Sequence, residues 1–161
     1  MKYCLSLSAA ILLIFISGAP AANAPKRAPK EYGTPEEMLQ AAPAEGMPLP
    51  GTKWTTLQME ATNAKLKELV VGQKASLAYK VMGVEKAKGG LRVITGEHMK
   101  FHGTTVVRHS YFTEDNVALL AKIKVGEMIR VNGVVSRCYL SRDKDTVWFI
   151  IHLAECTLPN K

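Results

Sequence analysis

The stretch that decides the fold runs from Gly103 to Leu158 and reads GTTVVRHSYF (103–112), TEDNVALLAKIKVG (113–126), EMIRVNGVVSRCYL (127–140), SRDKD (141–145) and TVWFIIHLAECTL (146–158). The first, third and last segments have the alternation and composition of β-strands, whereas the second has the spacing of a short helix. Strand, helix, strand, turn, strand is the order found in the second half of an OB barrel. The sequence therefore predicts a mainly β protein, a five-stranded OB-fold barrel with a helix between strands three and four.

The first half of the barrel is less regular in sequence. Alternation over 74–87 predicts strand one, with a bend at Gly83 where the strand passes between the two halves of the barrel. Strand two is predicted at 91–95, and the glycines and histidines of 96–103 predict a loop or an irregular hairpin before strand three. In the helix at 113–126 four apolar residues are expected to face the barrel, namely Val117, Leu119, Leu120 and Ile123. The expected core includes Leu120, Ile129, Val131, Val135, Phe149 and Ile151.

An extra N-terminal helix is predicted before strand one. Thr55 and Gln58 form a capping box at its start, and Gly72 follows its last turn. Its apolar face is drawn from residues three and four apart, Trp54, Leu57, Ala61 and Ala64, with Leu66 and Leu69 near it. We expect this helix to cover the strand at 147–158, because a strand that is apolar on both faces is usually covered on both. Trp54 is interpreted as a packing anchor rather than a ligand platform.

The N-terminal end has the composition of a secretory signal peptide. Basic Lys2 precedes an apolar run that is too short for a comfortable membrane span, and small residues follow it. Two cleavage sites fit, before Ala22 or before Pro25, and the first is preferred because proline directly after the cut is unfavourable; an uncleaved N-terminal anchor is the alternative. We expect residues 1–21 to be removed and the mature protein to be exported, periplasmic or extracellular, without a membrane span.

Residues 22–51 are predicted to form a Pro/Ala-rich flexible tail, ahead of an OB-fold domain at 52–161. The tail holds six prolines and few large apolar residues, so it buries little surface to offset its conformational entropy. One short helix is expected inside it, because Thr34 and Glu37 form a capping box around Pro35. Removal of the tail is expected to leave the stability of the domain unchanged.

The charge of the chain limits the kinds of ligand that it can bind. The chain of 161 residues has 21 Lys and Arg against 14 Asp and Glu, a net charge of +7, but these residues are scattered and form no dense basic run. Such scattering favours a solvated surface over a dedicated polyanion site.

Cys138 and Cys156 remain after export, and a hairpin centred on Asp143 and Lys144 sets them too far apart to bond. We expect two buried thiols, with a disulfide as the alternative.

Several short motifs match a known family. They are Tyr111-Phe112, Leu120-Ala121-Lys122-Ile123, Lys124-Val125-Gly126, Val131-Asn132-Gly133 and Cys156-Thr157-Leu158. In these motifs, and over roughly residues 61–158, the chain resembles the tRNA-anti-like OB-fold family of exported bacterial proteins. The resemblance implies the OB fold and a likeness to nucleic-acid-binding OB domains. It implies no activity, because the motifs are a helix stop, a strand glycine and core positions.

The candidate ligand-binding residues are aromatic and basic residues of strands two and three, where OB barrels bind single strands by stacking and charge. They are Arg92, Lys100, Phe101, Arg108, His109 and Tyr111. His98, His102 and His109 are interpreted as solvated residues rather than metal ligands, and His152 as a half-buried, hydrogen-bonded histidine. No nucleophile–base pair, phosphate loop or carboxylate pair is recognisable, so neither enzymatic activity nor any cofactor or metal is expected.

The functional hypothesis is an exported, non-enzymatic OB-fold module that binds an envelope protein, a glycan or another envelope component. The alternative is an extracytoplasmic binder of single-stranded nucleic acid or another polyanion. A third reading is an envelope stress or assembly factor in which the barrel is only a scaffold. Export disfavours nucleic acid as the partner, while the basic charge favours it.

Overall fold

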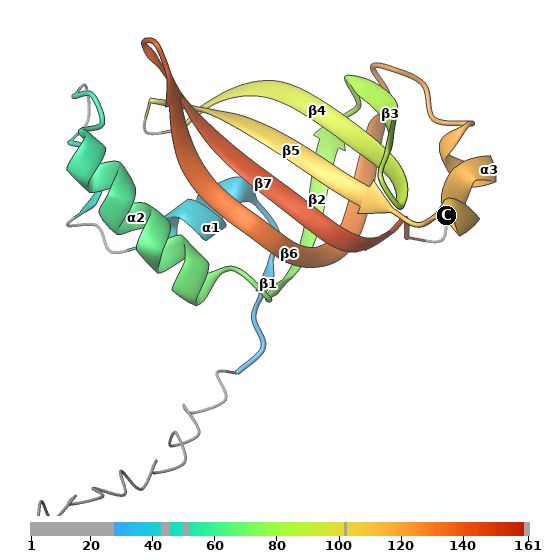
Figure 1. Ribbon diagram of the computed structural model, residues 1–161, viewed down its shortest axis with the longest axis horizontal. Coiled ribbons are helices and arrows are strands. Elements are labelled where there is room, and N and C mark those ends of the chain that lie inside the picture. Colours follow the sequence, from blue (N-terminus) through green and yellow to red (C-terminus); the bar gives the residue numbers. More distant parts are fainter. Residues whose placement is uncertain (1–27, 43–45, 50–51, 102, 160–161) are drawn as a thin grey trace, which may run out of the picture.

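In the computed structural model, residues 28–42, 46–49, 52–101 and 103–159 are described, and over this part of the chain the protein is mainly β (Figure 1). The strands are β1 (Glu31–Tyr32), β2 (Lys74–Lys80), β3 (Gly83–Ala87), β4 (Gly90–Phe101), β5 (Thr104–Phe112), β6 (Met128–Asp143) and β7 (Thr146–Thr157). They form one seven-stranded sheet in the order β1-β2-β6-β7-β5-β4-β3. The pairs β1–β2 and β5–β7 are parallel and the others are antiparallel.

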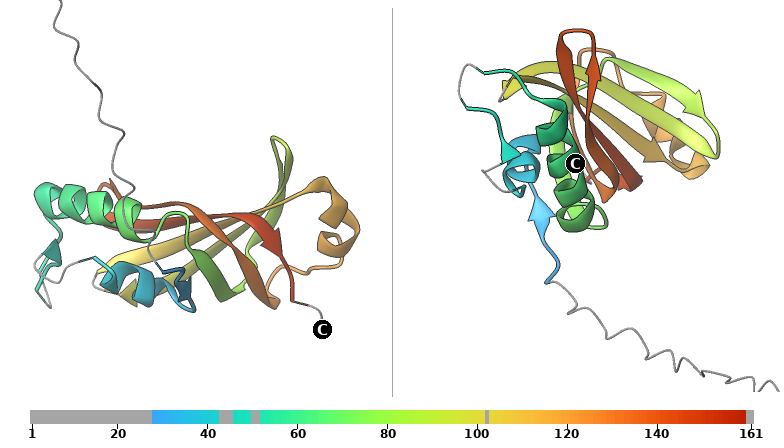
Figure 2. Two further views of the ribbon diagram at one scale, coloured as in Figure 1. Left: turned by 90° about the horizontal axis from the view of Figure 1, so that it is seen from below. Right: turned by 60° about the vertical axis from the view of Figure 1, so that its left-hand side comes forward.

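The sheet is strongly curved, and the helical segments lie at its two ends (Figures 1 and 2). Helices α1 (Pro35–Gln40) and α2 (Thr56–Leu69) lie at one end. The 3₁₀ helix η2 (Glu114–Asn116) and helix α3 (Val117–Leu120) lie at the other, between β5 and β6. The curved sheet thus has a buried inner face and an outer face.

The predicted first strand is present as two strands. Val81 and Met82 interrupt the run at 74–87, so that β2 pairs with β6 and β3 pairs with β4. Val81 exchanges backbone hydrogen bonds with the turn at residues 126–127, over 2.7 and 2.9 Å, and the Met82 amide donates to the Ile94 carbonyl over 3.1 Å. The bend predicted near Gly83 therefore separates β2 from β3, and these two strands lie near opposite ends of the sheet order.

Of the two alternatives predicted for 96–103, a loop or an irregular hairpin, the structure has the irregular hairpin. Strand β4 continues to Phe101 and pairs with β5 down to Thr104, with a register shift between Glu97 and Lys100. Glycine is a poor strand former on its own, but β5 pairs with β4 on both sides of the register shift. The irregularity at the shift accommodates the residues that break the strand pattern in the sequence.

The helix predicted at 113–126 is much shorter. After η2 and α3 the chain leaves the helical conformation near Ala121, where the amides of Lys122 and Ile123 donate to carbonyls only three residues back. Leu120 is buried as expected, but Val117 and Leu119 are exposed and do not face the core. The β-branched residues Ile123 and Val125 favour extended structure, which limits the helix to its first turns.

Helix α2 begins as predicted but packs differently. The Thr55–Gln58 capping box is present, and Trp54 is buried, which confirms it as a packing residue. The buried face is Met59, Thr62 and Leu66, however, while Leu57 is 75% exposed. The helix packs on β6 instead of covering the strand at 147–158, because the Asn63 side chain bonds both the amide and the carbonyl of Leu140, over 2.6 and 2.9 Å. A polar anchor, rather than the apolar spacing, thus sets its rotation.

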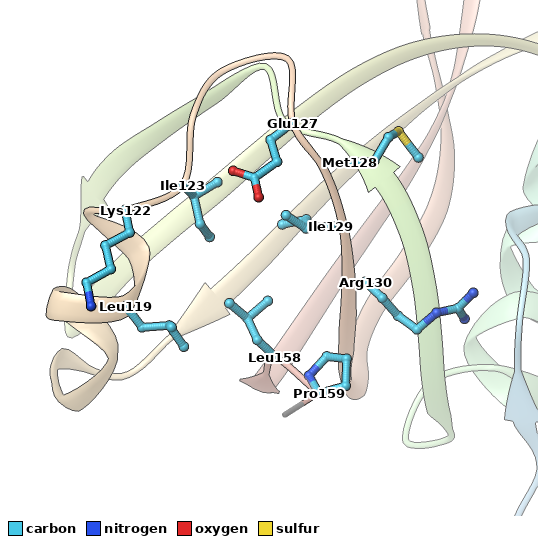
Figure 3. Close-up of a pocket in the computed structure, with 9 residues that line it drawn as sticks. All are labelled: Leu119, Lys122, Ile123, Glu127, Met128, Ile129, Arg130, Leu158 and Pro159. Carbon is cyan, nitrogen blue, oxygen red and sulfur yellow. The ribbon is translucent and has the colours of Figure 1, made fainter. Parts of the chain in front are cut away.

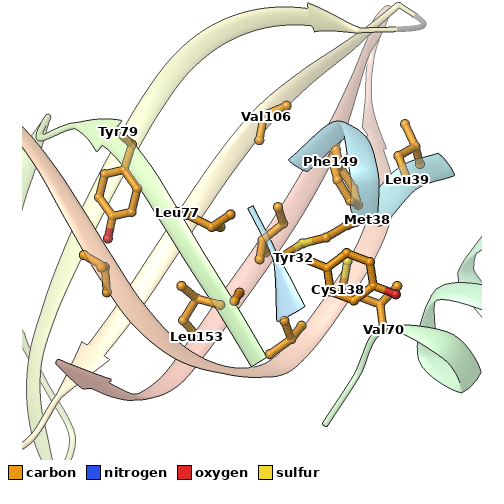
Figure 4. Close-up of a cluster of buried hydrophobic side chains, with 14 of the residues drawn as sticks. Tyr32, Met38, Leu39, Val70, Leu77, Tyr79, Val106, Cys138, Phe149 and Leu153 are labelled. Carbon is orange, nitrogen blue, oxygen red and sulfur yellow. The ribbon is translucent and has the colours of Figure 1, made fainter. Parts of the chain in front are cut away.

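The flexible tail predicted for residues 22–51 is wrong for the residues the structure describes there. Tyr32, Met38 and Leu39 are buried among the core side chains (Figure 4). Strand β1 adds to the edge of β2, and the Thr34 hydroxyl caps α1 by accepting from the Glu37 amide over 3.2 Å. The few large apolar residues of this segment lie where the curved sheet can bury them. The overall composition of the segment does not reveal this, because it counts these residues without their positions. The signal peptide predicted at 1–21 lies outside the described residues.

The core confirms most of the residues expected in it. Leu120, Val131, Val135, Phe149 and Ile151 are buried, while Ile129 is half-buried. Strand β5 alternates buried and half-buried residues along its whole length, as a strand between a core and an open face does. Figure 4 shows Leu77, Val106 and Leu153 directed into the space enclosed by the curved sheet.

Both cysteines are free and buried, as expected. The β6–β7 hairpin turns one residue later than predicted, with Asp143 opposite Thr146, so Cys138 lies opposite Ile151 rather than Phe149. Register shifts between residues 132 and 137 then bring Cys156 onto the same buried side as Cys138. Burial raises the pKa of Cys156 to about 11, so its thiol is protonated at neutral pH.

Candidate ligand-binding surface

Four half-buried rings lie on the outer face of the sheet, and we call them the ring platform. His109 and Tyr111 come from β5, His152 from β7 and Tyr139 from β6. Side chains two residues apart share a face of a strand, and His109 is directly opposite His152 in the parallel β5–β7 pair. The platform is therefore a product of strand parity and of the β5–β7–β6 order.

His152 is the centre of the platform. Its ring is stacked with His109 at 4.8 Å between centroids, with Tyr111 at 5.8 Å and with Tyr139 at 6.0 Å. The Tyr111 hydroxyl is hydrogen-bonded to His152 Nδ1 over 3.1 Å. Because these contacts come from three strands, the rings are held in place by the sheet rather than by a loop.

An arginine lies at each edge of the platform. The Arg137 guanidinium is 4.5 Å from the centroid of the Tyr139 ring, a cation–π contact. Arg92, on β4, is opposite Tyr111 in the sheet and forms a 2.7 Å ion pair with Glu85 of β3. The hydrogen bond to Glu85 raises the pKa of Arg92, which is charged at any ordinary pH.

The two histidines are neutral at pH 7. Partial burial, and after it the neighbouring His109, Arg137 and Arg92, lower the pKa of His152 to about 4. Burial and then Arg92 lower the pKa of His109. Among the described residues, His152 Nε2 and His109 Nδ1 have no hydrogen-bond partner. The platform thus combines neutral, weakly polar rings with fixed positive charge at its edges.

This arrangement limits how a ligand can bind. The ring faces inside the stack contact one another, so a flat ligand has no free slot between them. Ring edges, the tyrosine hydroxyls and the arginines remain for contact. Tyr and Arg are the residue types that contribute most to binding energy at protein interfaces, because each combines apolar area with directed donors.

The structure brings together three of the six residues predicted to bind ligand: Arg92, His109 and Tyr111. Arg108 was predicted to bind ligand on this surface, and that prediction is wrong. It is 1% exposed on the inner face, where Nη1 donates to the Ala78 carbonyl over 2.9 Å and the guanidinium lies 5.3 Å from the Tyr79 ring. Its neighbour His109 has the outward parity, so both cannot reach one surface. The side chains of Lys100 and Phe101 lie outside the described residues.

The prediction missed Tyr139, Arg137 and His152 as site residues. Parity alone already placed His152 on the face of Trp148 and Ile150, but not beside His109. That placement requires the parallel β5–β7 pairing, which joins residues more than 40 positions apart in the chain. Tyr139 could have been found from its alternation with buried Cys138 and Leu140.

Neither a metal site nor a membrane-spanning helix occurs in the part of the chain that the structure describes. Among the side chains that the structure describes, those of residues 28–42, 46–49, 52–95 and 103–159, no three His, Cys, Asp or Glu are grouped so that they could hold a metal ion. Within the same ranges, none of the helices has the length and apolar character needed to cross a bilayer.

No protein-family model matches the chain, and no curated protein matches it. Among solved structures, it is similar to a proposed nucleic acid-binding lipoprotein from Klebsiella pneumoniae, at 12% identity and a TM-score of 0.47, over 82% of this chain and 92% of that one. It is also similar to an aspartyl-tRNA synthetase from Entamoeba histolytica, at 14% identity and a TM-score of 0.33, over 84% of this chain but 27% of the synthetase. These likenesses are distant, and they identify neither a family nor a ligand.

Proposed function

We propose that the protein is an exported, non-enzymatic binding module of the OB type, and that the ring platform is its ligand surface. In this interpretation β2 and β3 are the two halves of one bent first strand, followed by β4, β5, α3, β6 and β7. The order β2-β6-β7-β5-β4-β3 supports it, because the two halves then form the two ends of the order and only Val81 and Met82 separate them. The helix between the third and fourth strands supports it as well.

The ligand that suits the platform best is a protein or glycan of the cell envelope. The observation that carries this proposal is the group of half-buried Tyr and His rings on an open sheet face, with Arg92 and Arg137 at its edges. Tyrosine provides apolar area and a hydroxyl at little entropic cost, which suits both peptide and sugar surfaces. The tyrosines and arginines of the platform are the residue types of a recognition surface.

Quantitative capture from the envelope fraction of the source cells tests this proposal. Immobilised mature protein should retain one or a few envelope components, and Tyr139→Ala combined with Arg137→Ala should reduce that retention at least about tenfold, since both residues have the character of hot spots. Lys67→Ala, an exposed change on α2, is the matched control and should retain as much as the native protein. Equal retention by the double variant and the control would exclude the platform as the ligand surface.

A second candidate function is binding of single-stranded nucleic acid. The two arginines beside aromatic rings favour it, as does the net charge of +7. Under our leading proposal, a fluorescent single-stranded oligonucleotide binds only weakly and is released at about 150 mM salt, because scattered charge gives attraction that salt screens. Tight binding that persists at that salt, and that is lost in Arg92→Ala with Arg137→Ala, would instead establish the second candidate.

A further inference from the structure

A pocket of about 540 Å³ lies at the end of the sheet opposite α1 and α2 (Figure 3). Its walls come from three segments: α3 and the turn after it, the start of β6, and the end of β7. Six of its nine lining residues are apolar, namely Leu119, Ile123, Met128, Ile129, Leu158 and Pro159. In Figure 3 the side chains of Leu119, Ile123, Ile129 and Leu158 are directed toward a common centre.

The pocket exists because the helix before β6 is short. The chain leaves the helical conformation near Ala121, so Leu120 is buried in the core, Ile123 packs against the core only partly buried, and Leu119 remains exposed beside the opening. Met128, at the first position of β6, is 60% exposed next to it. The volume of the pocket falls in the range of about 300–1,000 Å³ that is usual for small-molecule sites, and the pocket is predominantly apolar, as such sites are.

The charges around the pocket favour an anion at its mouth. Of the lining residues, Lys122 and Arg130 are cationic and Glu127 is anionic. The Glu127 carboxylate already accepts a hydrogen bond from the Lys124 amide over 3.1 Å. No ion pair of Lys122 occurs among the described residues, while Arg130 Nη1 donates to the Ser76 carbonyl over 3.2 Å. The lining therefore has one excess positive charge, with Lys122 and Arg130 on opposite sides of the pocket (Figure 3).

We propose that this pocket binds a free, single-chain anionic amphiphile, with its hydrocarbon chain against Leu119, Ile123 and Ile129 and its acidic head near Lys122. The site is separate from the ring platform, and it is independent of the function proposed for that surface. Burial of a hydrocarbon chain provides the affinity, because the lining is apolar and open to water at Leu119 and Met128. The ammonium group of Lys122 provides selectivity for a carboxylate or phosphate head.

Isothermal titration with dodecanoate, below its micelle concentration, tests the proposal on the mature protein. We expect saturable binding of one molecule per chain. Leu119→Glu should weaken that binding at least about tenfold, since a charged group then replaces part of the apolar wall. Leu119 is exposed, so the variant should melt with the native protein. Leu57→Glu, which changes an exposed leucine on α2 at the other end of the molecule, is the control and should bind dodecanoate normally.

Two comparisons test the chemistry of the head group and the source of the ligand. Dodecyltrimethylammonium should bind more weakly than dodecanoate, and Lys122→Ala should reduce that difference several-fold. The absence of saturable dodecanoate binding, or equal binding by Leu119→Glu, would overturn the proposal. Sedimentation with phosphatidylglycerol vesicles without binding of free dodecanoate would overturn it in favour of a membrane surface.

Discussion

Replacing Leu39 with alanine tests whether the N-terminal segment belongs to the folded domain. Leu39, on α1, is 0% exposed and lies among the core side chains. The change removes three buried carbons, which costs about 2.4 kcal/mol of transfer free energy at about 0.8 kcal/mol each. The remaining cavity adds to this, so we expect the free energy of unfolding to fall by about 3 kcal/mol and the melting temperature by about 10 °C.

Urea unfolding followed by the fluorescence of tryptophan provides the measurement, since Trp54 is buried in the native protein. Leu57→Ala is the matched control: the same substitution on α2, at a side chain that is 75% exposed, should change the free energy of unfolding by less than about 0.5 kcal/mol. If Leu39→Ala is as stable as Leu57→Ala, residues 28–42 do not pack on the sheet, and the flexible tail predicted from composition is right.

Three further predictions concern protons, close packing and thiols. Since the unfolded imidazole of His152 protonates near pH 6.5 and the folded one only near pH 4, stability should decline as the pH falls through this window. The loss should be about 1–2 kcal/mol after allowance for the partial exposure of the ring, and His152→Gln should remove most of it in melting curves. Gly133→Ala should cost at least about 2 kcal/mol, because the added Cβ would lie 2.8 Å from a carbonyl oxygen of β7, whereas Gly83→Ala meets no atom within 4 Å and should be near neutral. Cys138 and Cys156 should react with a thiol reagent only after unfolding; fast labelling of the native protein at pH 7 would contradict their burial.

The sequence predicted those parts of the fold that depend on local pattern. Alternation identified β5, β6 and β7, and the capping boxes at Thr34 and Thr55 identified the starts of α1 and α2. These features are specified by residues within a few positions of each other. A strand period or a cap is visible in the sequence because the interaction that makes it is also local.

The features that the sequence could not predict depend on partners far along the chain. The rotation of α2 about its axis follows from the hydrogen bonds between Asn63 and Leu140, two residues that are 77 positions apart in the chain. The burial of Tyr32, Met38 and Leu39 depends on a curved sheet formed by residues that follow them. The candidate site shows the same division, since the parity of His109 and Tyr111 is local, whereas their meeting with His152 requires the β5–β7 pairing.

The two ends of the sheet order have a consequence for association between copies of the chain. Strand β1 pairs with the first two residues of β2, Lys74 and Ala75, and the Lys30 amide just before β1 donates to Gln73 Oε1 over 2.8 Å. At the other end β3 is only five residues long, and its central residues include exposed Glu85 and Lys86. A short, charged edge strand is a poor template for a strand of another molecule. The β3 edge is thus protected against the sheet-to-sheet growth that leads to aggregation, and β1 protects the start of the β2 edge.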